Sequence, residues 1–338
     1  MITIDGSAGE GGGQVLRTAL SLSAITGRPF ALENIRAKRR RPGLQRQHLT
    51  CVTAAAQITR AKMSGAELGS GALRFEPGAI SGGAYDFAIG TAGSTILVFQ
   101  TVLPILLHAD VPSRLTLSGG THNPMAPTFD YLERVFLPQI KRMGADVDVS
   151  LHQAGFYPAG GGSWMAGISP SQKLQPLSIE NAGEVRLRRI FADVANIPFE
   201  IARREARKAA AMLSWPAEAA TPRTIKADGP GNVLTIEIAA DYVTEIFTGF
   251  GERGTSAEAV VARTVKEVRE YLVTKAPVGP HLADQLLLPL ALAGGGSFVT
   301  MHPTKHTTTN IAVIETFLPV ELKLDDLGDG RWRVSVRR

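Results

Sequence analysis

The sequence predicts an α/β (α+β) fold built from three repeated α/β units with a smaller inserted α/β domain, and three observations support this. Glycine makes up 35 of the 338 residues, and many glycines stand in short clusters that mark turns. Between these clusters, apolar residues at helical spacing alternate with extended stretches in a constant order. That order starts at Gly13 and starts again at Gly93, which indicates an internal repeat.

The first unit begins with the glycine cluster that ends at Gly13. Apolar residues recur at helical spacing from there to Gly27, and residues 30–35 then alternate as a strand does. The other elements expected in this stretch are a helix over 44–60, after Pro42 and Gly43, and extended segments over 73–75 and 85–89.

The second unit repeats this order after Gly93. It is predicted to contain a helix up to His108, a strand over 114–118, a helix over 127–143 and a strand over 147–151. Each unit is therefore expected to have strands on one side and two helices on the other.

A third unit is expected to begin near Gly162, but its elements are separated in the sequence. Its first strands are predicted at 164–168 and 177–179, whereas its helices follow only at 282–292 and 307–318. The remaining strands of this unit are predicted over 298–301 and 320–324.

The stretch between these parts has strands and amphipathic helices of its own. One helix carries an apolar stripe formed by Val261, Val265, Val268 and Leu272. Its other expected elements are strands over 184–194, 233–239 and 243–248 and a helix over 198–213. We therefore predict one domain formed by residues 1–181 and 278–338, interrupted by an inserted domain at residues 182–277.

The composition is that of a globular protein and excludes disorder of the whole chain, with 44% hydrophobic and 20% charged residues and a net charge of +5. The single cysteine, Cys51, allows no internal disulfide, and no secretion leader is visible, so a cytoplasmic location is expected. The longest apolar run, residues 95–107, is interrupted by Gln100 and Pro104 and is shorter than the ~20 residues of a membrane span, so no membrane partner is expected.

A glycine turn at residues 9–13 opens the first predicted helix. Backbone amides at such a helix start can bind phosphate, although the lysine of a Walker motif is missing and a purely structural turn is the alternative. Glu10 within the turn would need a metal ion between it and a phosphate, and Gln14 and Arg17 share one helical face.

A second candidate is the basic run at residues 36–41, which ends just before a helix start. Arginine's planar guanidinium suits bidentate contact with phosphate, and a helix N-terminus favours an anion. The alternative is a solvated basic loop.

The third candidate is His306, which lies between a strand and a helix whose threonines can cap it. A neutral imidazole there could attack a phosphorus held by the helix amides, whereas the alternative is a histidine that only caps or packs. A zinc pair with His302 is disfavoured, because Pro303 precludes an ordinary helix between the two. Asp284 stands near another helix start, and residues 155–162 form an aromatic and glycine-rich turn more typical of packing than of base stacking.

These segments together resemble the RNA 3'-terminal phosphate cyclase family, over essentially the whole chain. The resemblance rests on Asp5-Gly6, GEGGGQ with Leu16-Arg17, IRA with Arg39, PGL and RQHL, AGSTILVFQTVLP, the GGT and NP turn, GFYPAGGG, GPGN, HLADQ, and His306 with Thr309-Asn310-Ile311. It implies three α/β repeats like those of the enolpyruvyl transferases, with a smaller inserted domain.

The family's activity, as this resemblance implies, is a ligase reaction in three steps. A histidine takes AMP from ATP with release of pyrophosphate, passes AMP to an RNA 3'-phosphate, and the neighbouring 2'-hydroxyl closes a 2',3'-cyclic phosphate with release of AMP. The resemblance implies ATP and RNA with a 3'-terminal phosphate as partners and Mg²⁺ or Mn²⁺ as the divalent metal; it implies no oligomeric state.

The resemblance also assigns roles to individual residues. His306 matches the nucleophile, Glu10 the metal-binding carboxylate, and Asp284 an essential acid near the histidine. The phosphate-contacting positions are matched by Arg17, Arg36, Arg39 and Gln47, and the ATP pocket by Gln100, His281, Leu282, Ala283, Asp284 and Gln285. Two positions depart from the family pattern: His281 replaces a tyrosine and Ala154 a basic residue.

Two other functions would fit part of the sequence. A non-catalytic cyclase-like factor in RNA processing or ribosome assembly would keep this fold without the nucleophile, which His306 argues against. An enolpyruvyl transferase is suggested only by the repeat fold, and fold alone does not carry function. The basic residues of the inserted domain either guide RNA or solvate a surface: Arg186, Arg188, Arg189, Arg203, Arg204, Arg207 and Lys208.

Overall fold

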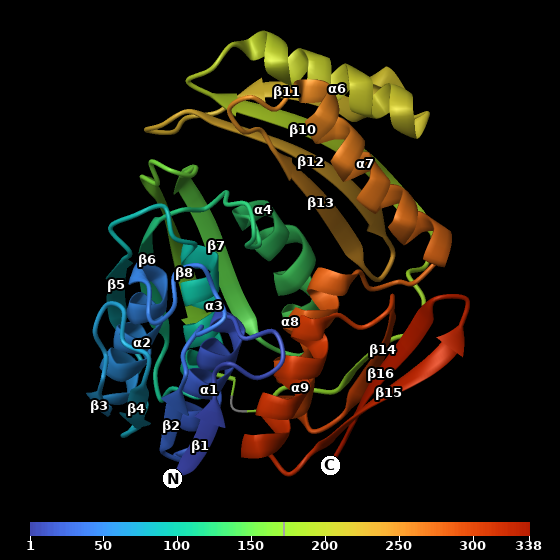
Figure 1. Cartoon of the computed structure of the whole chain (residues 1–338). Coiled ribbons are helices and arrows are strands. Elements are labelled where there is room, and N and C mark those ends of the chain that lie inside the picture. Colours follow the sequence, from blue (N-terminus) through green and yellow to red (C-terminus); the bar gives the residue numbers. More distant parts are fainter. Residues whose placement is uncertain (172) are drawn as a thin grey trace.

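Three sheets of one topology form the body of the molecule in the computed structural model, which describes residues 1–171 and 173–338 (Figure 1). In each sheet the first two strands are parallel neighbours, and the two later strands add antiparallel. The first unit consists of β1 (Ile2–Asp5), α1 (Gly13–Thr26), β2 (Phe30–Glu33), α2 (Arg46–Thr59), β3 (Lys62–Ser64) and β4 (Leu73–Glu76), with strand order β1-β2-β4-β3.

The second and third units repeat this order of strands and helices. The second consists of β5 (Ala84–Ala88), α3 (Thr95–Leu107), β6 (Ser113–Gly119), α4 (Phe129–Tyr131), the π-helical turn η1 (Leu132–Phe136), α5 (Leu137–Arg142), β7 (Asp146–Gln153) and β8 (Gly162–Ser169). The third consists of β9 (Leu177–Ile179), α8 (Pro280–Ala293), β14 (Gly296–Thr300), α9 (Lys305–Phe317), β15 (Glu321–Gly328) and β16 (Arg331–Arg337). Their strand orders are β5-β6-β8-β7 and β9-β14-β16-β15.

The predicted repeat is confirmed, but its third copy begins later than expected. The strand expected at 164–168 is β8, which pairs antiparallel with both β6 and β7 and so closes the second unit. Likewise, the segment expected at 85–89 is β5, which opens the second unit by pairing with β6. Sheet partners are set by contacts between distant segments, so the position of a strand in the sequence does not tell which sheet it joins.

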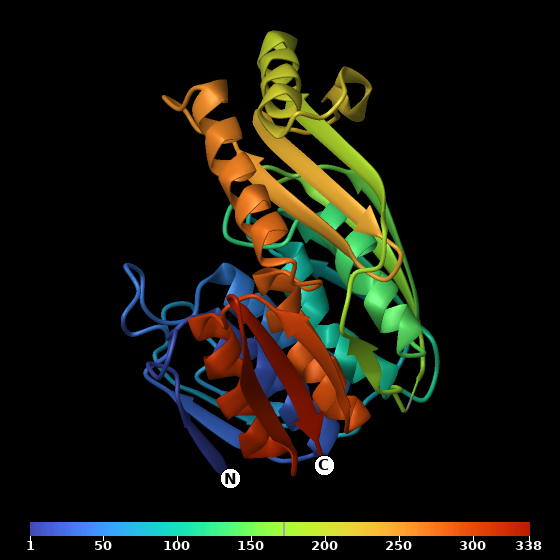
Figure 2. The ribbon, with the colours of Figure 1, turned by 90° about the vertical axis from the view of Figure 1, so that its right-hand side faces the viewer.

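The helices of the three units meet in the centre of the molecule, and the three sheets lie outside them (Figures 1 and 2). α1 packs against α2, α3 and α9, and α8 packs against α9. α3 and α8 are apolar around most of their circumference, which is typical of helices buried on all sides. Besides the buried Thr95 and Thr101, α3 contains the polar Gln100, which remains partly exposed. None of the helices formed by the described residues is long and apolar enough to cross a membrane.

A fourth sheet lies between β9 and α8 in the sequence and stands apart from the other three at one end of the molecule (Figure 2). It has strand order β11-β10-β12-β13, and α6 and α7 cover one face. Of the predicted stripe, the three valines are buried, whereas Leu272 is exposed and Tyr271 packs inward. Its elements are β10 (Val185–Ala195), α6 (Phe199–Leu213), the 3₁₀ turn η2 (Ala217–Ala219), β11 (Ala220–Thr224), β12 (Gly231–Ala240), β13 (Thr244–Phe250) and α7 (Ala257–Thr274).

The fourth sheet has its own hydrophobic core and is tied to the body by polar contacts and by Val243 and Ile246, which join the core of the body. Glu245 accepts a hydrogen bond from the Gly279 amide at the start of α8, at 2.6 Å. Arg134 in η1 donates to Glu237 in β12, at 3.1 Å. A separate core is the property expected of an inserted domain, and we propose residues 182–277 as its extent.

Candidate active site

The N-terminal ends of four helices meet around one cleft of about 740 Å³. α1, α2, α3 and α9 each contribute residues of their first turn or cap to its wall. Helix N-termini carry partial positive charge and free amide hydrogens, so four of them around one space favour an anion. The helices belong to all three units, which explains why the chain needs the complete repeat to form this cleft.

The side chains that line the cleft add to this positive field. Glu10 is the only Asp or Glu among the lining residues. The basic residues of the lining are Arg17, Arg36, Arg39, Arg41, Arg46, His48 and His306.

The glycine turn at residues 9–13 brings the backbone of α1 close to its neighbours. Gly9 has φ +57°, and a Cβ there would collide with Thr309 of α9. Gly13 faces Nε2 of His48 and Nη1 of Arg17 so closely that a Cβ would collide with both. Glycine is therefore required at these two positions, first for packing onto α9 and then to leave room for the basic groups.

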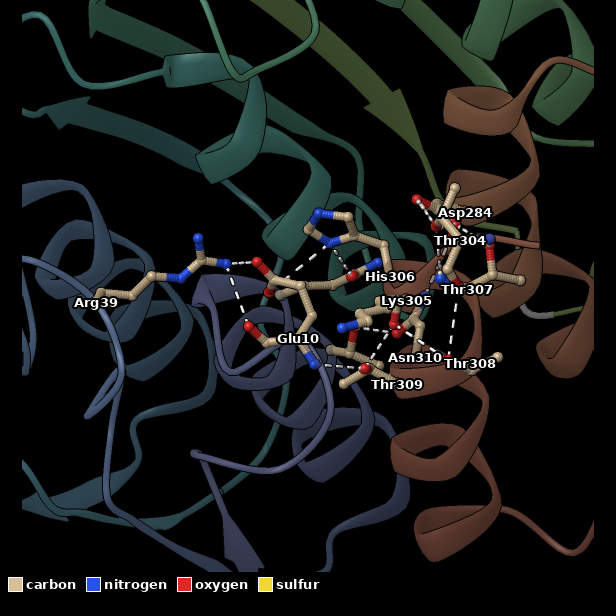
Figure 3. A network of polar contacts seen from close by, with 12 residues as sticks. Glu10, Arg39, Asp284, Thr304, Lys305, His306, Thr307, Thr308, Thr309 and Asn310 are labelled. Atoms are coloured by element: carbon tan, nitrogen blue, oxygen red, sulfur yellow. Dashed lines mark hydrogen bonds and ion pairs between the residues drawn. The ribbon is translucent and has the colours of Figure 1, made fainter. Parts of the chain in front are cut away.

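His306, at the start of α9, presents its ring to the cleft and is half exposed (Figure 3). Its Nδ1 lies 3.0 Å from Oε1 of Gln14 and 3.8 Å from Oε2 of Glu10. Because an amide oxygen only accepts, Nδ1 carries the hydrogen in this contact and Nε2 keeps a lone pair. Burial lowers the pKa of His306; Asp284 opposes this, and Arg17 and Arg39 add to it. The neutral ring is thus favoured at neutral pH.

Asp284, just after the first turn of α8, is bound to the N-terminal cap of α9. Its carboxylate accepts hydrogen bonds from Thr304 and Thr307, and its backbone oxygen accepts one from Asn310 at 3.2 Å (Figure 3). Burial raises the pKa of Asp284 to about 6. The contacts fix the start of the helix that carries His306, so Asp284 acts on the histidine through the helix and through its charge.

The basic run at residues 36–41 is divided between the cleft and solvent. Arg39 forms an ion pair with Glu10 and also donates to its backbone oxygen, at 3.3 Å (Figure 3). Arg36 donates to the carbonyl oxygens of Arg41 and Gly43, which holds the loop closed. The two basic residues of the run that do not line the cleft are Lys38 and Arg40.

Three further side chains complete the wall of the cleft. Arg17 is desolvated, which lowers its pKa, and no carboxylate among the described residues lies within ion-pair distance of it. Gln47 accepts a hydrogen bond from the amide of Ser94, the cap of α3, at 2.7 Å. His48 accepts from the Gln45 amide through Nδ1, so Nε2 carries its hydrogen, and burial lowers its pKa to about 3. His48 is therefore a neutral donor facing the cleft.

Of the residues predicted for an ATP pocket, some line a pocket and others point into the hydrophobic core. Gln100 donates to Gln285 at 2.6 Å, and both line a narrow pocket of about 90 Å³ beside the cleft, together with Asp284. Leu282 and Ala283 point into the hydrophobic core instead. The remaining member of the set, His281, is exposed at the surface, and desolvation by the atoms around its ring together with the charge of His306 lowers its pKa.

The sequence assigned no role to two residues that this geometry makes prominent, Gln14, which it only placed on one helical face with Arg17, and His48. Gln14 contacts a histidine 292 positions away, so no local pattern could reveal the pairing. For His48 a signal existed, because a side chain three residues after Gln45 can bond back to the helix cap.

A metal ion at Glu10 would depend on phosphate and water for most of its ligands. The described residues contain no group of three His, Cys, Asp or Glu side chains arranged to hold an ion. Mg²⁺ is commonly bound by one or two carboxylates together with substrate phosphates and water, and a single carboxylate beside arginines fits that pattern.

Comparison with known proteins gives consistent results for the whole chain. A family model described as RNA 3'-terminal phosphate cyclase matches residues 8–324. The proteins named RNA 3'-terminal phosphate cyclase from Ectopseudomonas mendocina and Pseudomonas fluorescens are each 52% identical, over 100% and 97% of this chain and 98% and 96% of their own. The Koribacter versatilis protein of that name is 50% identical over 96% of this chain and 92% of its own.

Among solved structures, the enolpyruvyl transferase NikO from Streptomyces tendae aligns with 98% of this chain and 47% of its own, with a TM-score of 0.38 and 13% identity. A match at this score adds nothing to the assignment.

Proposed function

This chain belongs to the RNA 3'-terminal phosphate cyclase family, and from that membership we propose that it uses ATP to convert an RNA 3'-phosphate into a 2',3'-cyclic phosphate in the basic cleft. The observation that carries the proposal is His306, whose ring faces the cleft with Nδ1 on Gln14 and a free lone pair on Nε2. A non-catalytic role would not require an oriented neutral imidazole among phosphate-binding groups.

In the first step, Nε2 of His306 attacks the α-phosphorus of ATP. A P–N bond forms, the bond to the bridging oxygen breaks, and pyrophosphate leaves with that electron pair. The hydrogen stays on Nδ1, and its hydrogen bond to Oε1 of Gln14 stabilises the positive ring of the adduct. Four helix N-termini and the arginines of the cleft stabilise the charge that develops on phosphate oxygens.

In the second step, an oxygen of the RNA 3'-phosphate attacks the phosphorus of the bound AMP and the P–N bond breaks. The electron pair returns to Nε2, so His306 is regenerated as the neutral ring. In the third step, the ribose 2'-hydroxyl attacks the 3'-phosphorus, its proton is lost, and AMP leaves as the ring closes. Adenylation thus supplies the leaving group that the RNA phosphate lacks.

The other predicted residues receive distinct roles in this proposal. Arg17 and Arg39 bind phosphate oxygens, Arg36 closes the loop that carries Arg39, and Gln47 holds the start of α3. Asp284 positions the helix of His306.

Two sets of residues are proposed to bind the nucleotide and its divalent ion. A divalent ion held by Glu10 would neutralise phosphate charge when bound. The pocket that Gln100 and Gln285 line beside the cleft is the proposed place for part of ATP, with His281 next to His306.

The proposal is tested by incubating the protein with ATP, Mg²⁺ and an RNA whose 3'-terminal phosphate is labelled. We expect the label to become resistant to phosphatase, and RNA ending in a 3'-hydroxyl to stay unchanged. His306→Ala should abolish the conversion, whereas His302→Ala should retain it, because His302 lies near but does not line the cleft. Conversion by His306→Ala at the wild-type rate would contradict the assignment.

A further inference from the structure

Three large apolar side chains are exposed at the same cleft. Leu68, Met125 and Tyr157 expose 58%, 95% and 69% of their surface, and all three line it. The same cleft holds His306 and the arginines. It therefore combines anion-binding groups with apolar ones, and exposed apolar groups that gather in one place mark a binding surface.

Tyr157 is presented by a segment that is itself fixed. The preceding Phe156 is 3% exposed, and its ring lies 5.3 Å from the ring of His122. The Gly160 amide donates to the Phe156 oxygen at 2.7 Å, and Gly155 accepts from two amides of the neighbouring turn. Phe156 anchors the turn while Tyr157 is exposed on it, so the backbone that carries the tyrosine is fixed before any ligand arrives.

Met125 lies on a second fixed turn and has an unusual backbone. Its φ is +71°, a conformation that residues with a side chain rarely adopt. Asn123 in the same turn donates to the Ala92 oxygen, and Thr128 caps the helix that follows. A strained residue that remains almost fully exposed contributes little to packing, and such strain is commonly retained where it serves binding.

Single-stranded RNA has the chemistry that matches both kinds of lining residue, with phosphates for the arginines and flat bases for the apolar side chains. We propose that Tyr157, together with Met125 and Leu68, forms a platform on which bases at the 3' end of the RNA substrate stack. Aromatic rings bind bases of any sequence in this way, because every base has a π face. The proposal rests on the proposed function of the cleft and adds the surface that recognises the RNA apart from its phosphate.

The test compares Tyr157→Ala, Tyr157→Phe and Tyr242→Ala, a variant at another exposed tyrosine that does not line the cleft. For a short 3'-phosphorylated oligonucleotide, Tyr157→Ala should raise KM about 5-fold or more with little change in kcat. Tyr157→Phe keeps the ring and should stay near the wild type, as should Tyr242→Ala. A second substrate, in which the last nucleotides lack their bases, should already have the raised KM with the wild type, and Tyr157→Ala should add nothing.

An unchanged KM in Tyr157→Ala would overturn the platform, and so would a penalty that persists on the abasic substrate. A rise in the KM for ATP during self-adenylation without RNA would assign Tyr157 to adenine instead and would also overturn it. Failure of the wild type to cyclise any RNA would refute the proposed function itself, so the two failures are distinguishable.

Discussion

The cleft and the inserted sheet are both rich in arginine, but the arginines differ in their partners. Of the ten arginines within residues 182–277, five form ion pairs with carboxylates at 2.6–3.3 Å; the pairs are Arg186 with Asp241, Arg189 with Glu237, Arg203 with Glu200, Arg204 with Glu258 and Arg223 with Asp193. No carboxylate among the described residues lies within ion-pair distance of the other five, Arg188, Arg207, Arg253, Arg263 and Arg269. In the cleft, Arg39 pairs with Glu10, and among the described residues no carboxylate lies within ion-pair distance of Arg17, Arg36, Arg41 or Arg46.

The difference shows that the pairing and the place of a charge, rather than the number of charges, separate a binding site from a solvated surface. A paired arginine on the surface adds little stability and offers little field to a distant anion. Unpaired arginines beside helix N-termini keep their field and their donors for a ligand. The cleft combines unpaired arginines with four helix N-termini, so we assign phosphate recognition to it.

The largest expected effect is on the rate of RNA cyclisation, and it should differ between neighbouring arginines of one loop. Arg39→Ala should lower RNA cyclisation about 30-fold or more, because it removes charge-assisted hydrogen bonds worth about 2–3 kcal/mol. Arg40→Ala and Arg204→Ala should stay within about twofold, since these residues lie outside the cleft. Steady-state cyclisation rates of the three variants provide the comparison, and a comparable loss in Arg204→Ala would remove the contrast between the two regions.

The next effect is on the salt dependence of RNA affinity. If the cleft holds about three phosphates, the logarithm of RNA affinity should fall with the logarithm of salt concentration at a slope near −2. Arg41→Ala should make that slope shallower by about 0.7, whereas Arg203→Ala in the inserted sheet should leave it unchanged. Titrations of labelled RNA at several salt concentrations measure both slopes, and equal changes in the two variants would argue against a phosphate contact confined to the cleft.

The last expected effect belongs to the inserted domain and acts on stability, not on cyclisation. Glu205 is fully buried in α6; burial raises its pKa from 4.5 to about 7, although Asn232 and Arg204 oppose the shift and Glu258 adds to it. The folded state then binds more protons than the unfolded state, so stability is lost as pH rises from about 4.5 to 7.

Glu205→Gln cannot ionise and should remove this loss, up to about 3 kcal/mol at pH 8. Denaturant unfolding at pH 5 and pH 8 measures it. Glu200→Gln, at an exposed position of the same helix, serves as the control and should keep the wild-type pH dependence. If Glu205→Gln keeps the pH dependence of the wild-type stability, a group other than Glu205 is responsible.

Much of the fold could be predicted because the repeat is visible in local sequence patterns. The starts of the helices follow glycine turns and capping residues, and their apolar periodicity is intact in all three units. The partner of each strand could not be predicted, since β8 joins the second sheet only through long-range pairing. β1 also escaped prediction, because four residues at the N-terminus carry too little pattern.

The candidate site was predictable in its residue types but not in its geometry. The basic run did not reveal that Arg39 faces Glu10 while Arg40 faces solvent. For the segment from His281 to Gln285 a signal was present, because consecutive residues of a helix point in different directions. In a helix, residues one or two positions apart point in different directions. Four consecutive residues, Leu282 to Gln285, therefore cannot all face one pocket.

The most direct test of the central claim is the identity of the residue that carries AMP. The wild-type protein is incubated with ATP and Mg²⁺ without RNA, and the adduct is located by mass spectrometry of the intact chain and of its peptides. We expect one AMP per chain on His306, retained in Lys305→Gln and lost in His306→Ala. An adduct on the neighbouring Lys305, or on any residue outside the cleft, would contradict the account.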